Sequence, residues 1–361
     1  MANRITGSTD VTGAISVRPK TVKSLLIVCE NGSTAVSGKA ESEKIYTVTG
    51  TNDASTKFGT KVANIVKVLI NNGVDNIKCI AIGEYGNEKA YTTAAKAYEG
   101  ALDKTLGDTS IKTIILDVAV SEIITVLKSH LAKAEGEDMF RYGVIGLTST
   151  DVDSAVTEVG SINEKRIFAP FPNFVDESNL ELDGIYAAAG LASLIMTETS
   201  DPAMPMNGVE MVGFGGTTMP LLKSQRTVLE QGGVTGIVGV GAPAVWRLVT
   251  TRTKDVNGDA DPIWHEGTTL FIADDVLETV ITTLQATYKR TKNTTRILDA
   301  IRTTVIGILE AKEGLEIIEN FDKNTVSVIQ DPEDIYGALV DYEFDVVTPL
   351  YTITITQHMK L

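Results

Sequence analysis

The sequence predicts a mixed α/β protein with two domains and an extended strand arm at each end of the chain. Three observations lead to this prediction. Strand-like and helix-like segments alternate between residues 21 and 195, a proline- and methionine-rich stretch follows at 201–208, and apolar and threonine side chains alternate after Pro349. The length of 361 residues is also typical of two domains. The expected parts are an N-terminal arm (1–20), an α/β domain (21–195), a second domain (196–347) and a C-terminal arm (348–361).

The first domain is predicted from short apolar runs that alternate with segments of helical spacing. The expected strands are 24–29, 77–82, 111–120, 142–147 and 166–169. The expected helices are 52–71, 91–102, 123–131 and 152–162. This order implies a sheet with helices packed against it. Two cysteines, Cys29 and Cys79, lie in the strand-like runs, and we expect buried, reduced thiols rather than a disulfide or a catalytic pair.

The second domain begins after a helix at 182–196 that is rich in alanine and glycine, and we place the boundary near 195–205. Helices are expected at 220–231, 274–290 and 295–312. Strands are expected at 234–240, 244–253, 326–329 and 338–347.

Both ends of the chain read as strands that need a partner. Tyr351, Ile353 and Ile355 share one face of the terminal segment, and Ile15 and Val17 belong to a short strand stopped by Pro19. Unpaired strand edges recruit other chains. We therefore interpret these five apolar residues as inter-subunit strand arms.

Composition and charge exclude several classes of function. The net charge of −15 argues against nucleic acid as the main partner, and no apolar run has the length of a membrane helix. The start of the sequence lacks the apolar core of a secretory signal. The charge is reversed locally, because residues 285–304 hold five bases and one acid. The bases are Lys289, Arg290, Lys292, Arg296 and Arg302, and they predict a docking patch for an acidic partner. The alternative is that Lys289 and Arg290 complement a helix C-terminus.

Candidate chemistry is weak throughout. The loop from Asp255 to Glu266 approaches the spacing of a calcium loop, but Ala260 replaces the glycine of its sharp turn, so we favour a polar hairpin loop. Two glycine clusters, at 213–216 and 236–241, lack a Walker motif and are interpreted as structural. The three histidines have no zinc-ligand spacing. We expect no catalytic residue, no cofactor and no metal.

Several stretches of the sequence, in this order and spacing, resemble the contractile tail sheath proteins of phage tails and R-type bacteriocins. They are residues 188–192 with 201–203 and 207–208, residues 229–235, residues 246–252, and the paired helices with their polar link at 289–295. Residues 58–59 and 73–78 extend the similarity upstream.

The resemblance implies a structural subunit that stacks as rings around a tail tube and contracts by rigid-body repacking without nucleotide hydrolysis. Its implied partners are further copies of itself, the tail tube protein, and baseplate and tail terminator proteins, in a virion or bacteriocin particle assembled in the bacterial cytoplasm. Residues 21–195 would form an outer domain inserted into an inner, tube-proximal domain made of the N-terminal arm and residues 196–347. The arms would add strands to neighbouring subunits, and the basic cluster would face the tube or an acidic surface of a neighbour.

Two other functions remain open at this point. A soluble α/β enzyme or nucleotide-binding protein would require converging titratable residues or a phosphate loop. A different self-assembling shell, or a secretion-system sheath, would share the arms.

Overall fold

The computed structural model describes residues 22–83, 91–239 and 241–351. Its central element is a six-stranded sheet in the order β2-β3-β1-β4-β5-β6, in which β2 is antiparallel to β3 and the other neighbours are parallel. The strands are β1 (Ser24–Cys29), β2 (Ile45–Val48), β3 (Ile77–Ala81), β4 (Ile111–Leu116), β5 (Tyr142–Val144) and β6 (Ile167–Phe168). Every residue of β1 is buried, as expected for a central parallel strand covered on both faces.

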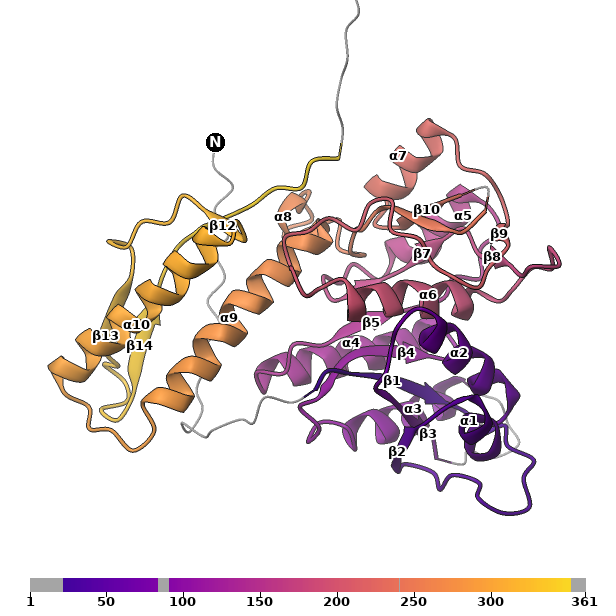
Figure 1. Ribbon diagram of the computed structural model, residues 1–361, viewed down its shortest axis with the longest axis horizontal. Coiled ribbons are helices and arrows are strands. Elements are labelled where there is room, and N and C mark those ends of the chain that lie inside the picture. The colour runs from indigo at the N-terminus through magenta and orange to yellow at the C-terminus, as the bar shows by residue number, and fades with distance from the viewer. Residues whose placement is uncertain (1–21, 84–90, 240, 352–361) are drawn as a thin grey trace, which may run out of the picture.

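Helices cover both faces of this sheet (Figure 1). They are α1 (Thr51–Phe58), α2 (Thr60–Asn71), α3 (Tyr91–Asp103), α4 (Ser121–Gly136), α5 (Val152–Gly160) and α6 (Gly184–Thr197). Leu25, Ile27 and Cys29 point toward α1, α2 and α6, whereas Leu26 and Val28 point toward α3 and α4. The alternation follows from the period of two in a strand. Both cysteines are free and buried, so that prediction is confirmed.

The expected single helix at 52–71 is wrong, because Gly59 divides it into α1 and α2. Gly59 has φ +97°, and a Cβ there would lie 2.6 Å from the backbone of Gly32. Only glycine allows this close approach and this backbone conformation.

A second, smaller sheet joins residues from both sides of the predicted domain boundary. It contains β7 (Pro170–Phe171), β10 (Thr235–Val238) and β11 (Ala244–Arg247), in the order β11-β10-β7. Nearby are the β8 (Phe174–Val175) and β9 (Gly216–Thr217) pair and helix α7 (Lys223–Gln231). One hydrophobic cluster runs from Leu25 to Phe271. We call residues 22–271 the body; the division into domains at 195–205 remains a prediction.

The chain then leaves the body along a long helix. After α8 (Pro262–His265) come α9 (Gly267–Thr287) and α10 (Thr295–Gly314). Two small antiparallel pairs follow: β13 (Ser327–Gln330) with β14 (Ala338–Asp341), and β12 (Ile318–Glu319) with β15 (Asp345–Val346). Figure 1 shows α9, α10 and these strands as a lobe beside the body. We call residues 272–346 the C-terminal lobe.

Two elements in this part differ from the sequence prediction. Helix α9 begins at Gly267, not near 274, because Glu266 and the residues after it are already packed against the body. The strand expected at 338–347 is interrupted, since β14 and β15 pair with different strands. In the part of the chain that the structure describes, no helix has the length and apolar content to cross a bilayer.

Candidate assembly surfaces

Tyr351, the last described residue, is held on the body by its side chain. Its hydroxyl donates to Glu266 Oε1 at 2.7 Å, and the Arg247 guanidinium lies 4.6 Å from its ring centre. Arg247 also donates to Glu266 Oε2, at 2.8 Å from Nη2 and 3.0 Å from Nε, and pairs with Glu230 of α7. Burial, with the negative charge of Glu266, raises the pKa of Tyr351, so the phenol stays a hydrogen-bond donor. We call Tyr351, Arg247, Glu266 and Glu230 the tail anchor.

Of the five predicted arm residues, Tyr351 alone belongs to the described part of the chain. Residues 348–351 do not form the expected strand, because Pro349 has no N–H to donate and Tyr351 is held through its side chain. Ile353 and Ile355, like Ile15 and Val17 of the N-terminal arm, lie outside the described residues.

The predicted basic cluster lies at the turn between α9 and α10. Lys289, Arg290, Lys292 and Arg296 are exposed, and none forms an ion pair with another described residue. Lys289 and Arg290 directly follow the C-terminus of α9, so the helix-dipole interpretation also stays open. Arg302 differs, since its Nε and Nη2 each donate at 2.8 Å to the backbone carbonyls of Val326 and Lys323. These two hydrogen bonds join α10 to the segment before β13 within the lobe.

The fold adds acidic residues to this basic turn. Asn293 Nδ2 donates to the carbonyl oxygens of Ile335 and Gly337, which places the β13–β14 turn beside the α9–α10 turn. That second turn carries Asp331, Glu333 and Asp334. The tip of the lobe therefore presents both signs of charge. The sequence pattern does not reveal this proximity, because the two turns are about 40 residues apart.

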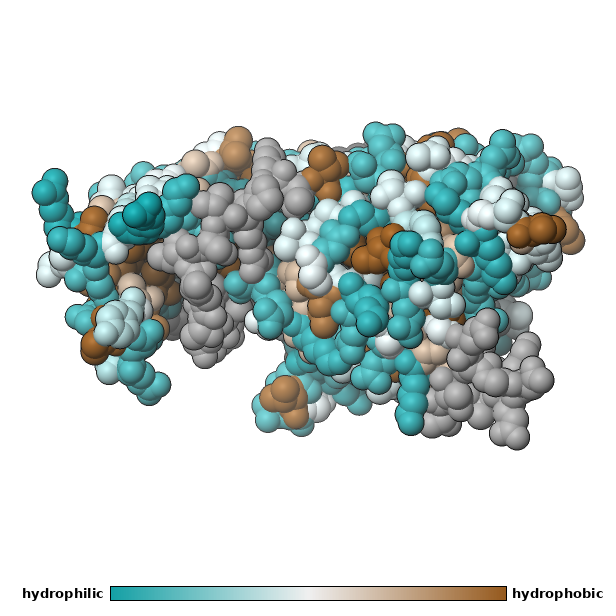
Figure 2. Space-filling model, turned by 90° about the horizontal axis from the view of Figure 1, so that it is seen from below, coloured by the Kyte–Doolittle hydropathy of each residue, from teal (hydrophilic) through white to brown (hydrophobic). Residues whose placement is uncertain are grey.

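The β13–β14 hairpin is an incomplete sheet. Within the described residues each strand pairs only with the other, so each keeps one open edge. One cross-strand pair, Val328 and Val340, is half-buried, whereas the next pair, Ile329 and Leu339, is 52% and 42% exposed. Tyr336 at the turn is 86% exposed. Figure 2 also shows hydrophobic residues exposed among hydrophilic ones at the end of the molecule that the lobe forms. Open edges with apolar side chains are typical of surfaces that bind another chain.

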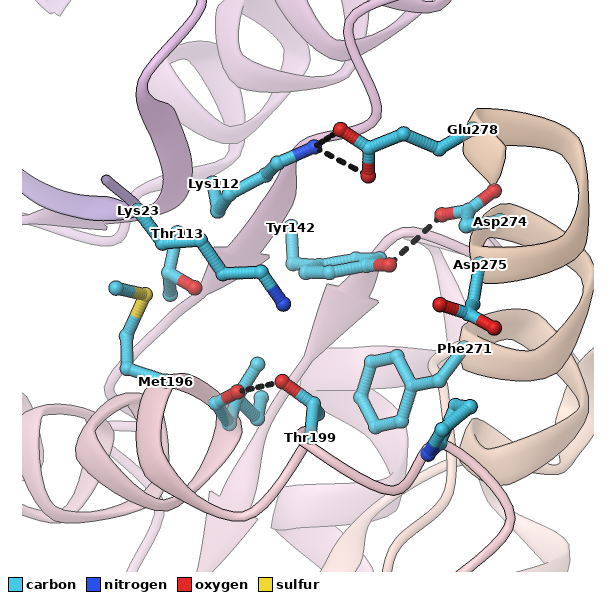
Figure 3. A pocket seen from close by; sticks show the side chains of 12 residues that line it. Lys23, Lys112, Thr113, Tyr142, Met196, Thr199, Phe271, Asp274, Asp275 and Glu278 are labelled. Atoms are coloured by element: carbon cyan, nitrogen blue, oxygen red, sulfur yellow. Dashed lines mark hydrogen bonds and ion pairs between the residues drawn. The ribbon is translucent and has the colours of Figure 1, made fainter. Parts of the chain in front are cut away.

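A seam of ion pairs fixes α9 to the rest of the chain (Figure 3). Asp274 accepts from Arg166 of the body at 2.6 and 2.8 Å and from the Tyr142 hydroxyl at 2.8 Å. One turn on, Glu278 accepts from Lys112 of β4 at 2.8 and 2.9 Å, and Asp275 pairs with Lys312 of α10. The pocket in Figure 3 encloses about 40 Å³ beside this seam, which is room for water and not for a substrate.

The candidate calcium loop is held by its own backbone. Asp255 Oδ1 accepts from the N–H groups of Asn257 and Asp259, and Lys254 bridges Ala260 as in a hairpin. Glu266, the proposed twelfth ligand, is occupied by Arg247 and Tyr351. Among the described residues no group of three His, Cys, Asp or Glu side chains could hold a metal ion.

The central sheet also has the place where an α/β enzyme would bind its ligand. Ligands of doubly wound sheets bind beyond the carboxyl ends of the strands at the switch in strand order, which here is between β1 and β4. A pocket of about 520 Å³ lies there. Its buried carboxylate, Asp117, already accepts from the Tyr98 hydroxyl and the Glu30 N–H, and Lys61 donates to the Asp117 carbonyl. These hydrogen bonds alone account for the burial of the Asp117 carboxylate, so no ligand is needed to explain it.

Comparisons with known proteins point to tail sheath proteins. Residues 259–360 match the family model of the phage tail sheath C-terminal domain. No curated protein sequence matches the chain.

Solved structures extend the likeness over nearly the whole chain. The sheath tail protein of Desulfitobacterium hafniense has a TM-score of 0.67 at 10% identity, with 95% of this chain and 97% of that one covered. The helical sheath of the anti-feeding prophage in its contracted state has a TM-score of 0.69 at 12% identity, with 99% and 98% covered. The contracted sheath of PVC, an extracellular contractile injection system, has a TM-score of 0.68 at 11% identity, with 100% and 99% covered. The resemblance predicted from the sequence motifs is thereby confirmed: residues 259–360 match the family model of the phage tail sheath C-terminal domain, and nearly the whole chain has the fold of tail sheath proteins.

Proposed function

We propose that this protein is the structural subunit of a contractile tail sheath, which polymerises as stacked rings around a tail tube. The observation that carries the proposal is the sheath-family match over residues 259–360, within a fold shared with contracted sheaths over nearly the full chain. The open β13–β14 hairpin in the same matched region supports it independently.

Neighbouring copies are linked through this hairpin. An extended arm of another copy adds a strand to an open edge of β13 or β14, so main-chain hydrogen bonds hold the copies together. The exposed Ile329 and Leu339 then pack against apolar arm residues, for which Ile15, Val17, Ile353 and Ile355 are the candidates. Backbone pairing tolerates changes in the angle between two copies, because the link lies in an arm and the rigid parts lie on either side of it.

Contraction requires no catalytic residue in this account. The seam joins the lobe to the body through buried pairs such as Arg166–Asp274, so each subunit moves as a unit. The free energy released comes from the new contacts between subunits. Residues 21–195 form the outer domain, and residues 196–347 with the N-terminal arm form the inner, tube-proximal domain.

The basic tip of the lobe is the proposed contact with an acidic tube. Lys289, Arg290, Lys292 and Arg296 are the exposed members, and Arg302 supports the turn from behind. Reversing Lys289, Arg290 and Arg296 to glutamate is expected to abolish tube-guided assembly, because the same tip already carries Asp331, Glu333 and Asp334. Normal sheathed particles from this variant would refute the tube contact and leave self-assembly untouched.

The remaining partners and the location follow from the same proposal. Baseplate and tail terminator proteins would bind the two ends of the polymer. The protein would act within a phage virion or a bacteriocin particle that is assembled in the bacterial cytoplasm.

Electron microscopy of the protein with its tube protein tests the proposal. The full-length chain is compared with a variant that lacks residues 352–361, which leaves the tail anchor in place. Tubes or rings that the full-length chain forms and the shortened chain does not are the expected result. Discrete monomers from both chains, with the tube protein present, contradict a sheath subunit. Identical tubes from both chains contradict the role of the C-terminal arm.

A further inference from the structure

Tyr351 lies where the C-terminal arm leaves the body. Between Val346, the end of β15, and Tyr351, none of residues 347–350 makes a hydrogen bond or ion pair with another described residue. Leu350 is 70% exposed. Among the described residues, the side chain of Tyr351 therefore makes the first polar contact that holds the chain on the body after β15.

The partners of Tyr351 are fixed in turn. Glu266 is 7% exposed, is the residue before α9, and accepts a further bond from Thr268 Oγ1 at 3.2 Å. Arg247 sits on β11 and is paired with both Glu266 and Glu230 of α7. Helix α9 is itself locked to the body by the Arg166–Asp274 pair. The ring of Tyr351 thus meets a rigid, charged surface built by three separate elements.

We propose that Tyr351 is the positioning residue of the C-terminal arm: its contacts with Glu266 and Arg247 set the point from which residues 352–361 reach a neighbouring copy. The inference rests on the proposed sheath function and goes beyond it, since it assigns a role to the base of the arm.

The anchor limits how far the arm reaches. The ten residues 352–361 would span at most about 35 Å if extended, so any contact that they make on the neighbour lies within that distance of Tyr351. Without the anchor, the free segment begins after Val346 and contains fifteen residues, which span up to about 50 Å. A longer, freer tether lowers the effective concentration of the arm at its acceptor and adds ordering entropy to each link.

Three variants of the full chain, assembled with the tube protein, test the inference. Tyr351→Ala removes both contacts and is expected to raise the critical concentration for assembly about tenfold. Tyr351→Phe keeps the ring against Arg247 and is expected to have a smaller effect. Leu350→Ala is the matched control, because it removes an exposed neighbouring side chain with no part in the anchor. The urea midpoint of the free subunit should stay the same in all three, since Tyr351 is only half-buried.

Epistasis separates the anchor from a general loss of fold. In a chain lacking residues 352–361, Tyr351→Ala should cause no further loss of assembly, because it acts only through those residues. If the intact chain assembles and depends on the arm, but Tyr351→Ala assembles at the wild-type concentration, the inference is wrong and the sheath function stands. An equal effect of Leu350→Ala also overturns the inference. If the wild type itself does not assemble, the proposed function fails, and the inference fails with it.

Discussion

The body and the C-terminal lobe differ in how completely they bury their apolar side chains. In the body, two dense clusters cover both faces of the central sheet, and strands such as β1 are buried along their whole length. In the lobe, residues 272–346 share a core of only eight buried apolar side chains among the described residues. The lobe also leaves Ile329, Tyr336 and Leu339 exposed on a two-stranded sheet.

The difference shows which part of the subunit is self-sufficient. A two-stranded sheet is marginal by itself in water and gains stability when further strands or apolar surface are added. The body has no such deficit. The charge of the lobe is itself uneven, since residues 285–304 hold five bases and one acid, whereas residues 315–350 hold nine acids and one base. We infer that the lobe is completed by other chains.

The largest effect is expected from charges on the open hairpin. Ile329→Lys combined with Leu339→Lys should abolish assembly, because both lysines would stand where an added strand packs. The free energy of unfolding of the isolated subunit should change by less than about 0.5 kcal/mol per site, as for other exposed positions. Val256→Lys, at a 91% exposed site of the body, is the control and should affect neither property. Normal tubes from the double variant would show that assembly does not cover these two side chains, and would contradict the contrast between body and lobe.

The seam between the two regions should be costly to break. Arg166→Ala leaves the buried carboxylate of Asp274 without its main partner, and we expect a loss of about 3–5 kcal/mol in the free energy of unfolding. Lys112→Ala breaks a neighbouring pair whose glutamate is 45% exposed, and should cost less than about 1 kcal/mol. Urea titration of both variants measures the difference. Equal losses of unfolding free energy in the two variants would mean that burial does not make the Arg166–Asp274 pair more important than the Lys112–Glu278 pair.

Acid should weaken the body through His130. Burial, with the positive charge of Arg141, lowers the pKa of His130 to about 3, and its Nε2 lies 2.9 Å from Arg141 Nη1. The unfolded chain binds this proton with a pKa near 6.5, so stability is full above pH 6.5 and falls as pH drops toward 3. The expected loss is about 2 kcal/mol at pH 5. His130→Gln, which keeps an acceptor for Arg141, should flatten this pH dependence, and an unchanged slope would rule His130 out as its source.

The smallest effects are expected from two glycine substitutions of opposite sign. Gly184 begins α6, and an added Cβ would lie 2.1 Å from the Leu147 carbonyl oxygen, so Gly184→Ala should destabilise the body by about 1–3 kcal/mol. Gly307 lies inside α10, with nothing within 4 Å of an added Cβ. Gly307→Ala should stabilise the free subunit by about 1 kcal/mol. Thermal unfolding of the two variants shows whether each substitution raises or lowers stability. A loss of stability on Gly307→Ala would contradict the open packing of the lobe.

Most elements could be predicted because they carry local patterns. The apolar runs at β1 and β4 and the helical spacing in α2 and α10 reflect one-sided or complete burial, which the sequence records directly. The division at Gly59 was missed, because its cause is the backbone of Gly32 from another part of the chain.

The assembly surfaces were predicted less completely, for the same reason. Tyr351 was predicted as part of an inter-subunit strand arm; its contact with Glu266 spans 85 positions and leaves no local pattern. The acidic turn beside the basic cluster is likewise a product of tertiary pairing. The open hairpin edge is a property of sheet topology, which short strand segments do not reveal.

Cryo-electron microscopy of the assembled polymer tests the central claim most directly, because it shows what lies along the edges of the β13–β14 hairpin. The account predicts that at least one edge is hydrogen-bonded to a strand from another copy, with Ile329 and Leu339 covered. A polymer in which both edges face solvent, while copies touch through their bodies alone, would contradict it.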